Sequence, residues 1–288
     1  MARTLNGLVR EALVEDIGLG DVTTNNTVPP EERCQVRLVA KQAGVLSGIE
    51  VFRQAFVCMK AEIRGWKALP DAARFKRREE VASFTGNTRS VLTAERTALN
   101  FVQHLSGVAT LTARYVAAVA GLKAKICDTR KTTPLLRKLE KHAVVHGGGS
   151  NHRLDLSNGI LIKENHIAAA GGIAEAVRKV RNGAHHLMRI EVEVTSLQEL
   201  EEALNAGADA ILLDNMSAEA MRKAVRRARG RKVLLEASGN VSLSNIRAIA
   251  ETGVDLISVG ALTHSAPAAD LSLLIAPDSP GSQGMGSS

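Results

Sequence analysis

Two short apolar runs in this sequence, Ala124–Cys127 and Gly159–Ile162, each end in charged residues. Four cations follow these runs or stand beside glycine-rich turns, and they are Arg130, Lys131, Arg153 and Lys163. A buried strand that ends in cations brings positive charge to one rim of a sheet or barrel, where a multiply charged anion can bind. We therefore predict that these four side chains bind an anionic ligand.

Three further cations of the same stretch have a different expected place. Arg137, Lys138 and Lys141 lie within a predicted helix, Leu135–His142. Because exposure to solvent is the usual state of Lys and Arg, we expect all three side chains to lie on the solvent-facing side of that helix.

The elements that must position the cations lie beyond Gly121, where apolar runs alternate with helical segments. The expected strands are Ala124–Cys127, Gly159–Ile162, Leu187–Val194, Ala210–Leu213, Val233–Ala237 and Leu256–Val259. Gly207 and Gly253 should each end a helix in the left-handed conformation just before a strand begins. Such alternation indicates a parallel sheet, either an α/β barrel or a doubly wound sheet. Polar residues follow every strand, which favours a barrel, because all strand ends then share one mouth.

Two carboxylates and two glycine-containing turns complete that mouth. Glu193 and Asp214 suit ribose hydroxyls, a Mg²⁺ that enters with a polyphosphate, or a developing positive charge. Backbone N–H groups in Ser238-Gly239-Asn240 and around Gly260 can bind phosphate. Cations for a leaving pyrophosphate and a carboxylate for an oxocarbenium-like carbon are what transfer from a phosphorylated sugar requires. Simpler roles stay open: Glu191 or Glu193 as an ion-pair member, and Asp214 as a helix N-cap.

The composition indicates the size of the protein and the kind of partner that it binds. The chain has 288 residues, of which 45% are hydrophobic and 23% charged, enough for one large domain or two modest ones. Its net charge of +7 suggests nucleic acid or a highly anionic small molecule as a partner. Only 2% of the residues are aromatic, too few for the stacking surfaces that bind single-stranded nucleic acid, so a small anionic substrate is favoured.

Cysteine, histidine and hydropathy patterns narrow the chemistry further. The three cysteines are widely spaced without a C-x-x-C pair, which argues against disulfides and zinc and suits a reducing cytoplasm. The histidines form no metal-ligand pattern, and no Ser/His/Asp or Cys/His pair stands out. No apolar run approaches the roughly 18 residues of a membrane span, and no signal peptide is recognised. The glycine- and serine-rich end is expected to be disordered.

Several motifs occur in an order that is typical of one enzyme family. They are Glu95–Asn100, Asp128–Pro134, Gly147–Arg153, Leu161–His166, Leu212–Asn215, Glu236–Asn240 and Ser258–Thr263, with Gly18–Thr24 near the N-terminus. On these residues the chain resembles the quinolinate phosphoribosyltransferases, also called nicotinate-nucleotide pyrophosphorylases (carboxylating). The resemblance covers nearly the whole chain and is highly specific, because several independent motifs keep their order.

The resemblance implies a reaction and a fold. Family members use phosphoribosyl pyrophosphate and Mg²⁺ to convert quinolinate into nicotinate mononucleotide, pyrophosphate and CO₂ for NAD synthesis. The implied fold is α/β. An N-terminal α/β sandwich, residues 1–106 with 266–288 returning to it, precedes an incomplete α/β barrel of the type II phosphoribosyltransferase kind, residues 107–265. The implied assembly is a homodimer or hexamer with shared active sites and no nucleic-acid or membrane partner.

The resemblance also implies roles for individual residues. The implied catalytic residues are Lys131, Lys163, Glu193 and Asp214, of which the two carboxylates also face Mg²⁺ indirectly. The remaining substrate-binding residues are Arg130, His152 and Arg153, the phosphate loops Ser238, Gly239, Asn240 and Val259, Gly260, Ala261, and Arg96, given to the adjacent subunit.

One segment, Met59–Ala82, departs from the family pattern. The family usually has an acidic strand-turn-strand there, with an Asp-Gly pair and a later glycine, whereas this chain is basic and irregular. Either the edge of the sandwich is rebuilt locally, or the source sequence carries a compensated reading-frame error, and resequencing would distinguish the two.

Two other functions stay open. One is that of a paralogue from molybdenum-transport loci, which acts on another acceptor. The complete Thr-Arg-Lys-Thr-Thr-Pro and Asn-His-Arg motifs favour quinolinate instead. The other is that of a basic nucleic-acid-binding protein that uses Arg64–Arg78, for which the scarcity of aromatic residues gives no support.

Overall fold

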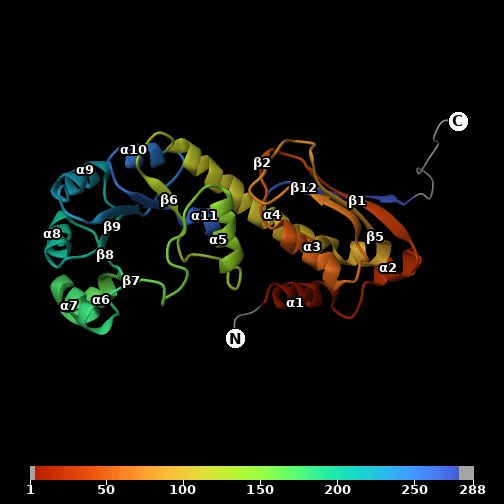
Figure 1. Cartoon of the computed structure of the whole chain (residues 1–288), viewed down its shortest axis with the longest axis horizontal. Coiled ribbons are helices and arrows are strands. Elements are labelled where there is room, and N and C mark those ends of the chain that lie inside the picture. Colours follow the sequence, from red (N-terminus) through yellow and green to blue (C-terminus); the bar gives the residue numbers. More distant parts are fainter. Residues whose placement is uncertain (1–3, 279–288) are drawn as a thin grey trace. The chain divides into compact units, whose positions relative to one another are not determined.

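The computed structural model describes residues 4–278, and the glycine- and serine-rich end that we expected to be disordered lies outside the described residues. The chain divides into two compact units. The first holds the residues up to Thr110 together with those from Pro267 onward, and the second holds Leu111–Ala266. Helix α4 (Thr88–Ala118) runs through the change of unit, and the domain boundary expected after residue 106 lies inside this helix (Figure 1).

A four-stranded antiparallel sheet forms the centre of the first unit, in the order β12-β1-β5-β3. Its strands are β1 (Arg33–Ala40), β3 (Arg64–Ala68), β5 (Glu80–Asn87) and β12 (Leu271–Pro277). In β1 every second residue is buried, because successive side chains of a strand point to opposite faces of the sheet. β12, drawn in blue, is the last strand of the described residues and lies beside β1, drawn in orange-red (Figure 1).

Helix α3 (Ile49–Cys58) covers one face of this sheet. Phe56 of α3 packs against Phe84 of β5, with 5.0 Å between the ring centroids, and Phe52 packs edge-on against Phe56. The remaining elements of the unit are α1 (Leu5–Ile17), α2 (Val22–Thr27), β2 (Gly44–Val45) and β4 (Arg74–Phe75). Helices packed on an antiparallel sheet confirm the predicted N-terminal α/β sandwich.

The segment 59–82, which departs from the family pattern, forms the edge of the same sheet. Strand β3 lies within it and pairs with β5 across a register shift. Trp66 of β3 extends the aromatic cluster, with its ring centroid 5.6 Å from that of Phe84. The guanidinium of Arg53 lies 5.5 Å from the Trp66 ring, within the range of a cation–π contact. The basic, irregular segment therefore builds a packed edge strand.

The turns of this edge have a left-handed backbone where glycine is absent. Ala72 and Arg78 both have φ of 69°, and hydrogen bonds from their N–H groups to Leu46 O and Ala40 O hold them there. A left-handed residue with a Cβ costs roughly 1–2 kcal/mol, more than the roughly 0.5–1 kcal/mol that the freedom of glycine costs. We therefore expect Ala72→Gly and Arg78→Gly each to raise the free energy of unfolding by about 0.5–1 kcal/mol in urea denaturation.

A neighbouring position supplies the control for this prediction. Ala73 lies outside the set of residues with positive φ, so Ala73→Gly should lower the free energy of unfolding by about 0.5–1 kcal/mol. A loss of stability in all three variants would show that the left-handed turns are not strained.

The second unit is built on a six-stranded parallel sheet, in the order β6-β11-β10-β9-β8-β7. Its strands are β6 (Lys125–Cys127), β7 (Ile160–Ile162), β8 (Ile190–Val194), β9 (Ala210–Asp214), β10 (Leu234–Ser238) and β11 (Leu256–Ser258). From β7 to β11 each strand pairs with the next one in the chain, without the reversal of order that defines a doubly wound sheet. β6 pairs with β11, and among the described residues nothing joins it to β7. The incomplete barrel is thus confirmed.

Helices and short turns connect these strands. The helices are α5 (Arg137–His146), α6 (Glu164–Ala170), α7 (Ile173–Gly183), α8 (Leu197–Asn205), α9 (Ala218–Arg227), α10 (Ile246–Ala250) and α11 (Ala261–His264). Ser217 caps α9 by accepting a hydrogen bond from the Ala220 N–H, so Asp214 does not serve as its N-cap. Gly207 and Gly253 have φ of 78° and 94°, the left-handed conformation that was predicted. Within residues 4–278, no helix has the length and hydropathy of a membrane span.

Candidate active site

A cavity of about 500 Å³ opens at the carboxyl ends of the parallel strands in the second unit. The predicted basic residues that line it are Arg130, Lys131, His152, Arg153 and Lys163. The predicted carboxylates and turn residues that line it are Glu193, Asp214, Ser238, Gly239 and Asn240. Parallel strands carry the residues after their carboxyl ends to one rim, so groups distant in the sequence meet there.

The predicted site residues that do not line the cavity are Arg96, Val259, Gly260 and Ala261. Gly260 of the turn 259–261 and the nearby Thr263 instead lie against Lys131. A Cβ on Gly260 would lie 3.3 Å from Cδ of Lys131, and the Thr263 hydroxyl donates to Lys131 O at 2.7 Å. Arg96 lies on α4 in the first unit, with an exposed side chain.

Two arginines of the cavity lie within each other's electrostatic reach. Burial, and then repulsion by Arg130, lowers the pKa of Arg153. Arg153 donates from Nη1 to Gly159 O at 3.0 Å, whereas the buried Nε of Arg130 has no hydrogen-bond partner among the described residues. A buried N–H without an acceptor is costly, so a carboxylate or phosphate bound by both guanidinium groups would be stabilised strongly.

Carboxylates and amides form a second group in the cavity. Glu193, in β8, pairs with Lys163 at 3.3 Å between Oε2 and Nζ. Asp214, which ends β9, accepts a hydrogen bond of 2.9 Å from the amide of Asn215. The side-chain oxygen Oδ1 of Asn215 accepts a hydrogen bond of 3.0 Å from Asn240 Nδ2. A Cβ on Gly239 would lie 2.1 Å from the same oxygen, so the turn must have glycine there. Asn215 therefore ties the Asp214 carboxylate to the glycine turn.

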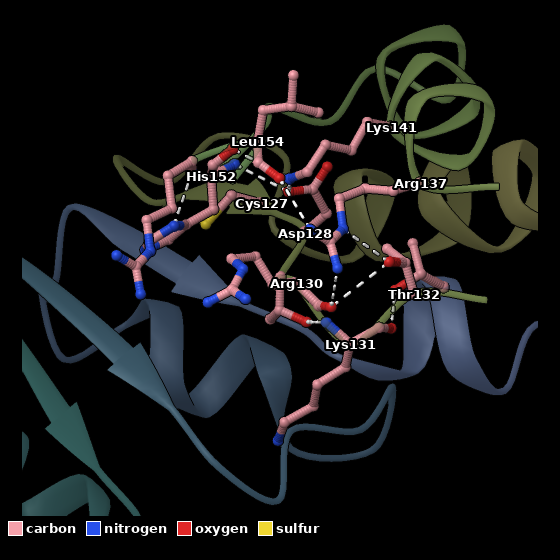
Figure 2. Close-up of polar contacts among 12 residues, drawn as sticks. Cys127, Asp128, Arg130, Lys131, Thr132, Arg137, Lys141, His152 and Leu154 are labelled. Carbon is pink, nitrogen blue, oxygen red and sulfur yellow. Dashed lines mark hydrogen bonds and ion pairs between the residues drawn. The ribbon is translucent and has the colours of Figure 1, made fainter. Parts of the chain in front are cut away.

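Arg137 of helix α5 donates hydrogen bonds to the segment before the helix and to the segment after it. Arg137 donates from Nε to Thr132 Oγ1 at 2.9 Å and from Nη2 to Arg130 O at 3.4 Å (Figure 2). Its Nη1 donates to Leu154 O at 3.3 Å. The expectation that Arg137 lies on a solvent-facing side is wrong, because this face of the helix meets the strand ends.

Lys141, one helical turn further along α5, is buried as well. Its side chain is 2% exposed and forms an ion pair with Asp128, which is fully buried (Figure 2). Lys141 Nζ also donates to His152 O at 3.0 Å, and the Asp128 carboxylate accepts from the His152 N–H at 2.9 Å. The expected exposure of Lys141 is therefore wrong, whereas Lys138 is exposed as predicted. The buried pair fixes the backbone at His152, next to Arg153.

His152 contacts two glutamates that the sequence did not mark as site residues. Its Nε2 lies 3.1 Å from Oε2 of Glu191 and 3.8 Å from Oε2 of Glu236. Its Nδ1 accepts a hydrogen bond of 2.8 Å from the backbone N–H of Arg153. Both ring nitrogens of His152 are thus engaged within the protein. Burial, and then repulsion by Glu191, raises the pKa of Glu236 to about 7.

Several lining residues were not predicted, and they are Thr129, Leu161, Leu212, Asn215, Glu236 and Ser258. Thr129, Asn215 and Ser258 adjoin a predicted residue in the sequence, so the same strand-end signal covers these three. Leu161, Leu212 and Glu236 lie two residues before a predicted one, inside apolar runs. Glu236 also begins the motif Glu236–Asn240, which could have marked it, and β10 brings it to the cavity.

Comparison with known proteins gives consistent matches along the chain. The model of the quinolinate phosphoribosyl transferase N-terminal domain matches residues 21–106, and that of the C-terminal domain matches residues 108–274. The probable nicotinate-nucleotide pyrophosphorylase (carboxylating) of Bacillus subtilis is 40% identical over 269 residues, 93% of this chain and 92% of the relative. The nicotinate-nucleotide pyrophosphorylase (carboxylating) of Mycobacterium leprae is 44% identical over 273 residues, 92% of this chain and 95% of the relative.

A solved structure shows the same architecture. The nicotinate-nucleotide pyrophosphorylase from Francisella tularensis superposes with a TM-score of 0.89 at 44% identity, covering 94% of this chain and 96% of that one. The family models match both predicted domains, the α/β sandwich and the incomplete barrel, and the fold of each agrees with the match. The chain therefore belongs to the quinolinate phosphoribosyl transferase family.

Proposed function

We propose that this protein transfers the phosphoribosyl group of phosphoribosyl pyrophosphate to quinolinate and releases CO₂. The products are nicotinate mononucleotide and pyrophosphate, on the route to NAD. The observation that carries the proposal is one cavity in which four cations meet two carboxylates at the strand ends. The pyrophosphorylase activity in the names of the two bacterial relatives supports the same reaction.

The arginines and lysines suit the acceptor. Quinolinate carries two adjacent carboxylates, and a guanidinium can grip a carboxylate with two parallel hydrogen bonds. The partnerless Nε of Arg130 and the repulsion between Arg130 and Arg153 both favour an anion at this place. Lys131 and Lys163 add positive charge for the second carboxylate and for phosphate.

The carboxylates suit the donor. As pyrophosphate departs, the sugar carbon becomes oxocarbenium-like, and a carboxylate such as Glu193 or Asp214 stabilises the positive charge. Ribosylation turns the ring nitrogen into a pyridinium, which accepts the electron pair that the departing 2-carboxylate leaves behind. The turn 238–240 offers backbone N–H groups for the 5-phosphate.

The donor set also fits Mg²⁺. Glu193 and Asp214 offer the carboxylate oxygens that Mg²⁺ prefers, and both line the cavity. Lys163 already pairs with Glu193, so we propose that these carboxylates hold the ion through water and through the substrate pyrophosphate. Bound there, Mg²⁺ would neutralise charge on the leaving pyrophosphate.

The assembly and the compartment belong to the same proposal. The exposed Arg96 lies in a motif that resembles the family's shared arginine, and we propose that it completes the site of an adjacent subunit in a homodimer or hexamer. Cys34, Cys58 and Cys127 are free thiols, which suits a reducing cytoplasm.

Release of labelled CO₂ tests the proposed function. We expect the protein to release CO₂ from carboxyl-labelled quinolinate only when phosphoribosyl pyrophosphate and Mg²⁺ are both present. No release from folded, oligomeric protein would contradict the proposal. Binding of quinolinate alone would then distinguish a damaged enzyme from a paralogue that uses another acceptor, because only the damaged enzyme should still bind it.

A further inference from the structure

A small group of ionisable side chains, of which His152 and Glu236 line the cavity, has not been used by the proposed reaction so far. His152, Glu191 and Glu236 offer ring nitrogen and carboxylate atoms that all lie within 4.8 Å of one another. The exposed fractions of their side chains are 16%, 12% and 1%. Glu236 lines the cavity, and its Oε1 has no hydrogen-bond partner among the described residues.

The hydrogen bonds decide where protons lie in this group. The backbone N–H of Arg153 points at Nδ1 of His152, so Nδ1 acts as an acceptor and carries no hydrogen. The single ring hydrogen is then on Nε2, which donates to Glu191 and faces Glu236. The hydrogen bond with Glu191 raises the pKa of His152 and so favours a charged ring, but the second hydrogen of that ring, on Nδ1, would point at the Arg153 N–H, which the geometry does not allow. We therefore assign His152 as neutral.

With a neutral His152, the next proton belongs to a carboxylate. Glu191 and Glu236 cannot both be ionised cheaply at this distance in a buried place. Glu236 is the more deeply buried of the two, and burial together with the charge of Glu191 raises its pKa to about 7. The other groups that face it are the Ser258 hydroxyl and the buried Cys127 thiol, and neither supplies a positive charge.

Glu236 differs in burial from the carboxylate Glu193 of the same cavity. The side chain of Glu236 is 1% exposed, whereas that of Glu193 is 19% exposed. A general acid works best when its pKa lies close to the working pH, and a lysine near 10 holds its proton too tightly for that. A carboxylic acid kept neutral by burial is the better-matched proton source.

The proposed reaction needs such a source, and the inference rests on that reaction. We infer that Glu236 is the general acid that protonates C2 of the pyridine ring as CO₂ departs. The bond from C2 to its carboxylate breaks, and the electron pair stays on C2 beside the pyridinium nitrogen. In the same step this electron pair forms the new C2–H bond with the Glu236 proton, so loss of the acid slows CO₂ release itself. Glu236 is left as a carboxylate and takes a proton from solvent before the next turnover.

Glu236→Gln tests this role because the amide keeps the size of the side chain and cannot act as an acid. Pyrophosphate and CO₂ are measured separately in a single turnover. We expect pyrophosphate release to stay within a few-fold of the unaltered protein and CO₂ release to slow by about 100-fold or more. The nucleotide that still carries both carboxylates should accumulate. Equal rates of both releases, as in the unaltered protein, would overturn the inference.

Two further variants separate acid chemistry from a structural role. Glu236→Asp retains an acid and should recover part of the CO₂ release that Glu236→Gln loses. Glu191→Gln removes the charge that disfavours ionisation of Glu236, so the alkaline limb of CO₂ release should move to lower pH. An unmoved limb would overturn the inference even if Glu236→Gln fails to fold. Absence of pyrophosphate release from the unaltered protein would instead reject the proposed function itself.

Discussion

Lys141→Met should lower the free energy of unfolding by about 3–5 kcal/mol, the usual cost of leaving a buried charge without its partner. Asp128 is fully buried, and Lys141 is the cation that pairs with it. Methionine fills a similar volume, so the loss reports the charge and its hydrogen bonds more than a cavity. Urea denaturation at neutral pH measures the change.

A matched variant and a double variant control this prediction. Lys138 lies on the same helix with an exposed side chain, and Lys138→Met should change the free energy of unfolding by no more than about 0.5 kcal/mol. Adding Asp128→Asn to Lys141→Met removes the orphaned charge and should recover roughly 0.5–3 kcal/mol. Equal stability of Lys141→Met and Lys138→Met would refute the buried ion pair.

Arg153→Ala or Lys131→Ala should each cost about 2–4 kcal/mol of transition-state stabilisation, or roughly 30- to 900-fold in kcat/KM. Both side chains line the cavity, and Arg153 is held by its bond to Gly159 O and by the fixed backbone beside His152. Such a preorganised cation stabilises developing charge without the reorganisation that water requires. Steady-state assays of nicotinate mononucleotide formation measure the loss.

The geometry of the guanidinium provides a finer comparison. Arg153→Lys keeps the positive charge but cannot form bidentate hydrogen bonds with a carboxylate. Its kcat/KM should therefore fall between those of the unaltered protein and Arg153→Ala. Arg222→Ala removes an exposed arginine from α9 and should leave kcat/KM unchanged. Near-normal turnover of Arg153→Ala or of Lys131→Ala would remove that residue from the proposed site.

Much of the barrel was predictable because one local rule governs it. Short apolar runs followed by polar residues marked the strands and their carboxyl ends, and parallel pairing then placed those ends on one rim. Arg130, Lys163 and Asp214 could therefore be grouped before any contact was known.

The errors arose where the outcome depends on contacts between distant segments. Arg137 and Lys141 have the spacing of one helix face, but nothing in that spacing says that the face meets Asp128 and the backbone at 152–154. Glu236 opens the motif Glu236–Asn240, but it sits in an apolar run, and its place in the cavity near His152 comes from β10. Charge and periodicity alone cannot report such neighbours.

The segment 59–82 was unreadable for a different reason. Four of the seven non-glycine residues with positive φ in the described chain lie within it, and they are Lys60, Glu62, Ala72 and Arg78. Sequence reasoning recognises turns mainly by glycine, so turns built without glycine give no signal. The strand between them is recognisable only through the packing of Trp66 on Phe84.

The position of β12 beside β1 has a consequence for how the protein is made. Ribosomes synthesise the chain from its N-terminus, and domains fold as they emerge. Leu111–Ala266 is therefore synthesised before β12, the strand that completes the sheet of the first unit. Until then one edge of β1 keeps a row of open N–H and C=O groups, a template on which other chains could pair. The unit that is first in the sequence is thus the last to finish folding, because its sheet waits for the strand that is made last among the described residues.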